Sequence, residues 1–496
     1  MPREKHPKIF FFPGIGCEVI DLFGNPKFLR FDYSSSLSKD IASSLSKLTA
    51  GEKPKWKNQK IKNVSLKIFN QWKKSGGKIF EKNLIEKKIS SPELSPLTFK
   101  NNHLTSNKKI DWKKIESFLK GKKFRIERRK ENPLRKNSEY PCFIFVVKNG
   151  DSVISEGKST SKSQAKKSAM AEAVERLLSK KPADERFLLR SQKDIFGELI
   201  HFESGSRDVF SQDLITEWIP AYNFSRKKWS WMPAEAAYMD YIPKNGIKAF
   251  CLHHTMGLAA GKSFEEAAMN GLLEVIERDA YWNVMRCRIN CPDIKISQLS
   301  EKSRKLISSL EKQGLRIVLK NISLDWPINV AHATIINEKE SLPAFSHGTG
   351  CAFSFKEAAE KALLESIQVY SGLAEIAKHE WSRIISVEGV LGNSRFAWTD
   401  PLIKPHINHL IEKGPVDKRN KKKIAKNISD LVKMLCIKDH EILSSNLGEE
   451  KGLVVVRTYL TGATHPDDRL ERISKRLQNN IKTHCPKGAY WDPILI

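Results

Sequence analysis

The stretch GLAAGKSFEEAAMNGLLEVIERD, residues 257–279, combines a glycine-bracketed loop with an alanine-rich segment of helical periodicity. Asn270, Glu274 and Glu277 stand at i, i+4 and i+7. At 100° per residue, this spacing places them within about 60° on one face of a helix. Leucine, valine and isoleucine fill much of the rest of the segment. The stretch therefore predicts a helix that carries two carboxylates and an amide in largely apolar surroundings.

The same pattern occurs twice more. It recurs upstream in GKSTSKSQAKKSAMAEAVERL and downstream in GTGCAFSFKEAAEKALLESIQ, where the spacing selects Ser168, Glu172 and Glu175, and then Lys361, Glu365 and Gln368. A single polar stripe is most often a solvated helix face. Three stripes that are each flanked by alanine, methionine, leucine or valine leave little surface for water, so solvation explains them poorly.

Carboxylates in such surroundings need a counter-charge. Glutamate, glutamine and asparagine oxygens suit Mg²⁺, which binds few carboxylates together with water and phosphate oxygens. The glycines would let the backbone approach a ligand near helix N-termini, where N–H groups favour phosphate. The three units together predict a site for a nucleoside triphosphate with magnesium.

These motifs resemble the three nucleotide-binding motifs of the YcaO domain. The resemblance covers roughly residues 140–390 and includes WIPAYNFSRKKWSWMPAEAAYMDY, which is similar to the tryptophan- and proline-marked hairpin of that family. It implies an enzyme that uses ATP to phosphorylate the oxygen of a peptide backbone amide, so that a nucleophile can replace this oxygen. The implied reaction requires no nucleophile from the enzyme, and we assign no serine or cysteine to catalysis.

The resemblance also implies roles for individual residues. It implies ATP contacts from Lys158, Ser168, Glu172, Asn270, Glu274, Arg286, Lys361, Glu365 and Gln368. It implies magnesium ligands at Glu172, Glu175, Glu274, Glu277 and Glu365. The family pattern favours Arg286 as a phosphate contact, whereas straight-helix geometry places Arg288 nearer the Asn270 face. Lys361 stands where the family usually has arginine. The positive charge is kept, but the planar guanidinium that can bind a phosphate through two hydrogen bonds is lost.

The reaction product stays open at this stage. Family members that form azolines often end in PxPxP, whereas this sequence ends in YWDPILI. We then expect thioamide or amidine formation by an outside nucleophile as much as azoline formation. The expected partners are a peptide or protein substrate and a separate leader-binding or sulfur-delivery protein, with a homodimer as a further option.

The charge is high and uneven. The 496 residues carry a net charge of +28, and residues 1–140 hold 33 Lys and Arg against 14 Asp and Glu, which is +19. A solvated lysine-rich surface or a docking surface for an acidic leader peptide, RNA or ribosome would each explain this excess. Two alternatives to an enzyme follow: a basic RNA- or ribosome-associated protein with degenerate motifs, and a noncatalytic ATP-binding scaffold of a modification complex.

The pattern of elements indicates an α+β fold, with helices and one mixed or antiparallel sheet around a central nucleotide site. We expect a basic N-terminal region at 1–138 for partner or leader docking, a nucleotide-binding core at 139–390, and a C-terminal part of the same domain at 391–496 with a polar basic insertion. A hairpin around residues 148–151 feeds the first striped helix. This β-β-α order also occurs in double-stranded-RNA-binding domains, but such a module has no reason to repeat its helix twice more.

Compartment signals are few. No apolar run reaches the roughly 20 residues of a membrane span, and the apolar start is interrupted by Pro13 and Gly14 without a signal-peptidase site. Eight cysteines without a CxxC pair fit a reducing compartment. We therefore expect a cytoplasmic protein.

Overall fold

The fold is described from a computed structural model of the chain. These are residues 109–130, 132–133, 141–181, 188–191, 215–239, 241, 254–339, 341–385, 404–416, 424–464 and 475–484, with the strands at 8–12, 16–20 and 26–30 and residues 59, 62 and 66. Most of the predicted N-terminal region before residue 109 and the C-terminal YWDPILI lie outside the described residues.

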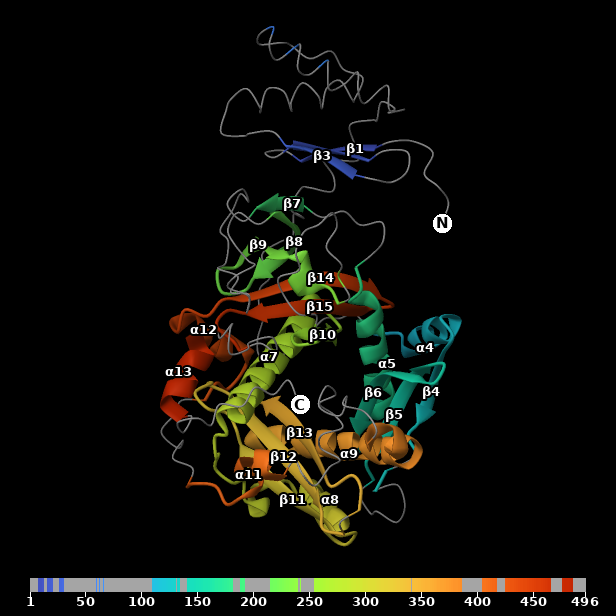
Figure 1. Cartoon of the computed structure of the whole chain (residues 1–496), viewed down its shortest axis with the longest axis vertical. Helices are drawn as coiled ribbons and strands as arrows, with labels where there is room; N and C mark the ends of the chain where they lie inside the picture. The colour runs from blue at the N-terminus through green and yellow to red at the C-terminus, as the bar shows by residue number, and fades with distance from the viewer. Residues whose placement is uncertain are drawn as a thin grey trace.

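The chain contains two units with the same α-β-β-β-α order of elements, the first at the right of Figure 1 and the second in its lower part. The first consists of α4 (Trp112–Gly121), β4 (Phe124–Arg128), β5 (Phe143–Asn149), β6 (Ser152–Ser159) and α5 (Lys162–Leu178). The second consists of α8 (Glu301–Glu311), β11 (Leu315–Asn321), β12 (Asn329–Asn337), β13 (Phe345–Ala352) and α9 (Phe355–Ile385). Each sheet is antiparallel and has its strands in sequence order.

The central striped helix follows a strand of a larger sheet. β10 (Leu258–Gly261) leads into α7 (Phe264–Cys287), and β10 is the edge of a six-stranded antiparallel sheet in the order β10-β15-β14-β8-β7, with β9 paired to β8. The other strands are β7 (Leu188–Ser191), β8 (Ile215–Asn223), β9 (Lys228–Pro233), β14 (Ile442–Glu450) and β15 (Leu453–Leu460). The remaining elements are β1 (Lys8–Phe12), β2 (Gly16–Ile20), β3 (Pro26–Arg30), α6 (Ala234–Ala237), η2 (Ile296–Gln298), α11 (Lys404–Ile411), α12 (Ile428–Ile437) and α13 (Lys475–His484).

The expected α+β class and the hairpin before the first striped helix are confirmed, but the expectation of a single sheet is wrong. Among the described residues there are four separate antiparallel sheets. Moreover, α4 and β4 lie inside the predicted N-terminal region, yet they pack with β5 and α5, so the first unit already begins near residue 109. Within the described segments, no helix combines the length and apolar composition of a membrane crossing.

Glycines in β6, β10 and β13, which we call the glycine strands, allow each strand to pack closely against the alanines of the helix that follows it. A Cβ on Gly157 would lie 2.2 Å from the backbone of Ala165 and Ala169, and one on Gly261 would lie 2.5 Å from the Ala267 nitrogen. The equivalent atom on Gly350 would lie 2.3 Å from the Ala358 oxygen. Only residues without a side chain on the strand permit this approach. The sequence signature of glycine before an alanine-rich helix therefore reflects close strand–helix packing.

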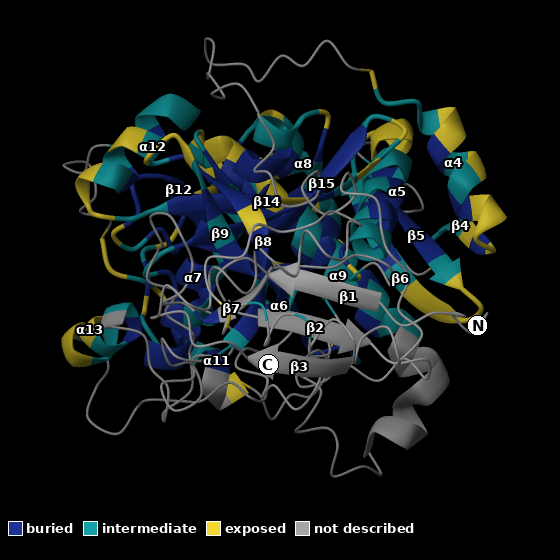
Figure 2. Ribbon diagram, turned by 90° about the horizontal axis from the view of Figure 1, so that it is seen from above, coloured by how far each residue is buried: buried dark blue, intermediate teal, exposed yellow. Residues whose placement is uncertain are grey.

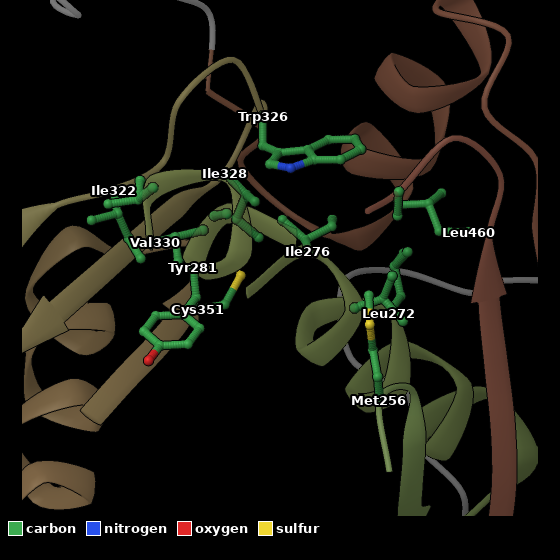
Figure 3. Close-up of a cluster of buried hydrophobic side chains, with 14 of the residues drawn as sticks. Met256, Leu272, Ile276, Tyr281, Ile322, Trp326, Ile328, Val330, Cys351 and Leu460 are labelled. Atoms are coloured by element: carbon green, nitrogen blue, oxygen red, sulfur yellow. The ribbon is translucent and has the colours of Figure 1, made fainter. Parts of the chain in front are cut away.

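Helix α7 runs through the main hydrophobic core. Its side chains Leu272 and Ile276 join one buried cluster with Ile328, which precedes β12, and with Leu460 of β15 (Figure 3). Burial is densest around α7 and the sheets that flank it (Figure 2). The helix thus fixes the six-stranded sheet and the second α-β-β-β-α unit on either side of itself.

Candidate nucleotide site

The three glycine strands open onto one large pocket. The pocket has a volume of about 1050 Å³ and is lined by residues of β6, β10 and β13 and of α5, α7 and α9. Each of these strands is the outer strand of its own sheet. The pocket is therefore enclosed by three strand edges and by the three striped helices that follow them.

Polar side chains of the helix stripes form hydrogen bonds with backbone groups of these outer strands. Glu172 accepts a hydrogen bond from the Glu156 amide at 3.2 Å, and Glu365 accepts one from the Thr349 amide at 3.2 Å. In each case the acceptor stands sixteen positions after the donor. Asn270 donates to the Ala260 carbonyl at 3.0 Å. Backbone groups at a buried edge need such partners. Part of the motif spacing is therefore structural, and it orients the carboxylates.

The structure brings most of the predicted residues together. Eight of the predicted ATP or magnesium residues line the pocket: Lys158, Ser168, Glu172, Glu175, Asn270, Glu274, Glu365 and Gln368. Glu277 lies just behind this wall, where its carboxylate accepts a 2.6 Å hydrogen bond from the Thr349 hydroxyl. Thr349 thereby connects Glu277 to Glu365.

Two predicted ATP contacts do not lie on the pocket wall. Lys361 donates to the Cys351 carbonyl at 3.2 Å and pairs with Glu357 at 3.2 Å. Arg286 is 1% exposed, and its guanidinium lies 5.1 Å from the centre of the Trp282 ring. Twelve residues along a helix turn a side chain by about 120°, so Arg286 faces away from Glu274. For these two residues the predicted contact to ATP stays a prediction.

Sequence reasoning missed two arginines on the pocket wall. Arg278 lies 3.8 Å from a carboxylate oxygen of Glu274 and 3.8 Å from one of Glu365. Arg176 donates to Glu172 at 3.1 Å. Both arginines follow a stripe glutamate by four residues, so the i,i+4 charge pairing within E-x-x-E-R was a signal that could have found them.

A second charged cluster on the wall had no sequence signal. Arg129 is 5% exposed, forms an ion pair with Glu156, and donates to Glu375 at 2.6 Å. Glu156 also accepts a 3.0 Å hydrogen bond from the Gln368 amide. Arg129 and Glu375 are 246 positions apart, and no local pattern connects them.

Burial and crowding make the carboxylates reluctant to ionise together. Burial, reinforced by the neighbouring Glu274 and Glu172, raises the pKa of Glu175 well above its usual range. Burial raises the pKa of Glu274 to about 7, although Arg278 opposes the shift. Burial and the charge of Glu365 raise the pKa of Glu277. These shifts come chiefly from burial, and a bound cation would favour the ionised forms.

Glu365 behaves in the opposite way. Burial disfavours its ionised form, but Lys158 and Arg278 outweigh that effect and lower its pKa. The Lys158 ammonium lies 3.8 Å from a Glu365 oxygen. Glu365 therefore stays ionised more readily than Glu274 or Glu277. Its ion pair with Lys158 joins strand β6 to helix α9 across the pocket.

The donors fit magnesium that arrives with a nucleotide. Within the described residues, no three acidic, histidine or cysteine side chains already stand close enough to hold a metal by themselves. Mg²⁺ does not require such a cage, because it commonly takes one or two carboxylates and completes its shell with water and phosphate oxygens. The raised pKa values of Glu175, Glu274 and Glu277 mark the oxygens that a divalent ion would neutralise.

Comparisons with known proteins give a matching family model and a relative of similar sequence. The family model described as YcaO cyclodehydratase, ATP- and Mg²⁺-binding, matches residues 156–464. An uncharacterized protein of Methanothermobacter thermautotrophicus is 26% identical over 358 residues, which cover 69% of this chain and 90% of the relative.

Two solved structures have a similar fold. A heterocyclase in complex with substrate and cofactor aligns with a TM-score of 0.63 and 18% identity over 81% of this chain. The alignment spans only 58% of that heterocyclase. A YcaO protein from Methanopyrus kandleri bound with AMPPCP and Mg²⁺ aligns with a TM-score of 0.53 and 20% identity, over 73% of this chain and 94% of the other.

Proposed function

This chain belongs to the YcaO family, and from that membership we propose that it uses ATP and Mg²⁺ to activate a peptide backbone amide for replacement of its oxygen. ATP and Mg²⁺ are the cofactors by which the family is described. The observation that carries the proposal is the convergence of three carboxylate-bearing helices on one pocket of about 1050 Å³. A pocket of this size suits a nucleotide together with part of a peptide.

The chain's own residues supply charge and position. The bound Mg²⁺ and ATP supply the phosphoryl group and neutralise charge on it. Glu172, Glu175, Glu274, Glu277 and Glu365 offer carboxylate oxygens to the metal. Lys158 and Arg278 face the same space and would hold phosphate oxygens. Their present pairing with Glu365 keeps these cations oriented before a ligand arrives.

No enzyme nucleophile takes part in the proposal, and the cysteines support this view. Burial raises the pKa of the Cys142 thiol to about 12, and burial together with Glu277 raises that of Cys351 well above its ordinary value. A buried thiol that resists ionisation is a poor nucleophile. The group that replaces the amide oxygen then comes from the substrate or from outside.

We extend the proposal to three products: an azoline, a thioamide or an amidine. A side-chain nucleophile of the peptide would give an azoline, whereas an outside sulfur or nitrogen donor would give a thioamide or an amidine. A peptide or protein in natural-product or ribosomal modification is the proposed substrate. A separate leader-binding or sulfur-delivery protein is the proposed partner, and residues 1–138 are its proposed docking region. Intact-mass analysis separates loss of water from exchange of oxygen for sulfur.

Calorimetric titration of ATP with and without Mg²⁺ tests the site. The wild-type protein is expected to bind ATP only with Mg²⁺, and Glu172→Gln and Glu274→Gln are each expected to abolish binding, because they remove oxygens from the pocket wall. Glu265→Gln is the matched control, since Glu265 lies in the first turn of α7 and outside the pocket lining. Binding that survives both pocket substitutions would refute the assignment.

Turnover tests the enzymatic part. Release of ADP that depends on an added peptide supports an enzyme, and the Glu274→Gln protein should release none. ATP binding without turnover, even with partner and peptide present, would instead favour the noncatalytic scaffold.

A further inference from the structure

The two α-β-β-β-α units differ in the charge of their outer surfaces. The separation in sequence between Gly157 and Gly350 equals that between Glu172 and Glu365, so positions in α5 can be matched to positions in α9. Lys162, Lys166 and Lys167 of α5 then correspond to Phe355, Ala359 and Glu360 of α9. The scaffold itself therefore does not require lysines at these positions.

Both helices of the first unit pack on the same side of its sheet. Leu119 of α4, Phe145 of β5 and Ala169 of α5 belong to one buried cluster. The two helices also contact each other directly, because Lys166 pairs with Glu116 at 2.7 Å and the Lys167 ammonium lies 5.8 Å from the Trp112 ring centre. The outward sides of α4 and of the first turns of α5 thus form one continuous surface.

Lysine dominates that surface. We define the basic face as the lysines of α4, of the turn that follows it and of the first two turns of α5: Lys113, Lys114, Lys120, Lys122, Lys123, Lys162, Lys166 and Lys167. Six of these eight are exposed, all except Lys166 and Lys167, which are partly buried. The acidic residues of α4 and its cap are Asp111 and Glu116. They pair with Lys114, Lys120 and Lys166 but leave the face with a positive excess.

We propose that the basic face binds double-stranded RNA. Lysines on the outward sides of two adjacent helices present point charges to phosphates without reading bases. RNA duplexes are recognised mainly through shape, phosphates and 2′-hydroxyls, because their deep major groove excludes side chains. The α-β-β-β-α arrangement, with both helices on one side of the sheet and lysines at the start of the second helix, is also the arrangement of double-stranded-RNA-binding domains.

An acidic peptide fits this face less well. Peptides are usually held in a groove or along a sheet edge, whereas the basic face consists of the outward sides of two helices that cover their sheet. The striped residues Ser168, Glu172 and Glu175 lie further along α5 and line the nucleotide pocket instead. RNA binding and nucleotide binding therefore use different parts of one helix, and this inference does not depend on the proposed reaction.

Fluorescence anisotropy with a labelled RNA duplex of about 20 base pairs tests the proposal, since such modules span roughly 16 base pairs. The variant Lys113→Gln/Lys114→Gln/Lys162→Gln removes three exposed charges of the basic face. Its matched control is Arg304→Gln/Lys312→Gln/Lys356→Gln, which removes three exposed charges from the second unit. We expect the plot of log affinity against log salt to become shallower by about 2 to 3 in the first variant, because each lost phosphate contact removes about 0.9. The control should keep the wild-type slope.

Urea unfolding, measured on the same samples, shows that each variant is folded. Four outcomes would overturn the proposal: no duplex binding by the wild-type protein, an equal loss in both variants, equally tight binding of a DNA duplex of the same sequence, or tighter binding of an acidic peptide of matched charge. The last outcome would make the basic face a peptide-docking surface.

Discussion

Replacing Glu274 by glutamine should abolish ATP binding and yet stabilise the ligand-free protein at alkaline pH. The pKa of Glu274 lies at about 7 in the folded protein, against 4.5 for an ordinary glutamate, chiefly because the side chain is buried. The folded protein therefore holds this proton more tightly than the unfolded chain does. Stability is unaffected below about pH 4.5, falls as pH rises toward 7, and carries the full penalty above 7.

The size of the effect follows from the shift. Each pKa unit corresponds to about 1.4 kcal/mol, so the shift from 4.5 to about 7 sets an upper limit of about 3 kcal/mol. The Glu274 side chain keeps 26% exposure, and solvent screening reduces the penalty. We therefore expect the glutamine variant to be more stable at pH 8 by roughly 1 to 3 kcal/mol and nearly unchanged at pH 4.5.

Urea unfolding at pH 4.5 and pH 8, with a chelator present, measures both differences. Glu265→Gln again serves as the control, because it changes the same residue type on the same helix away from the pocket. Addition of Mg²⁺ and ATP should then stabilise the wild-type protein but not Glu274→Gln. If the variant were less stable than wild type at pH 8, the ionised carboxylate would be making net favourable contacts, and the assignment of a crowded, cation-requiring site would be refuted.

Three further predictions use other residues. Arg278→Ala should weaken Mg²⁺-dependent ATP binding roughly 10- to 100-fold in calorimetry, which corresponds to the 1.5–3 kcal/mol of hydrogen bonds to a charged group, whereas Arg304→Ala on the exposed side of α8 should change nothing. Equal affinities would remove Arg278 from the site. Gly157→Ala should cost roughly 1–3 kcal/mol or more in urea unfolding, because the new Cβ would meet backbone at 2.2 Å, while Gly121→Ala meets nothing within 4 Å. Similar stabilities would contradict the close strand–helix packing. Lys361→Arg should leave ATP affinity unchanged, since Lys361 is not on the pocket wall, and a clear gain in affinity would show that this side chain reaches the nucleotide.

Local patterns in the sequence were sufficient for the helices, the hairpin and the identity of most pocket carboxylates. Glu172 and Glu365 each stand fifteen positions after a strand glycine, and Glu274 stands thirteen positions after Gly261. Helical periodicity alone places each glutamate on the stripe of its helix. The alanines beside the glycines encode close packing in the same short stretch. Such features depend on neighbours within about twenty residues, and the sequence displays these neighbours directly.

The tertiary structure alone decided which side chains share the pocket and how their charges behave. It brought Arg129 to Glu375 across 246 positions and put strand edges from three separate sheets around one space. The pKa of Glu274 near 7 likewise depends on burial by elements that are remote in the chain. Desolvation and charge pairing are set by distances in space, and for these residues sequence separation carries no information about such distances.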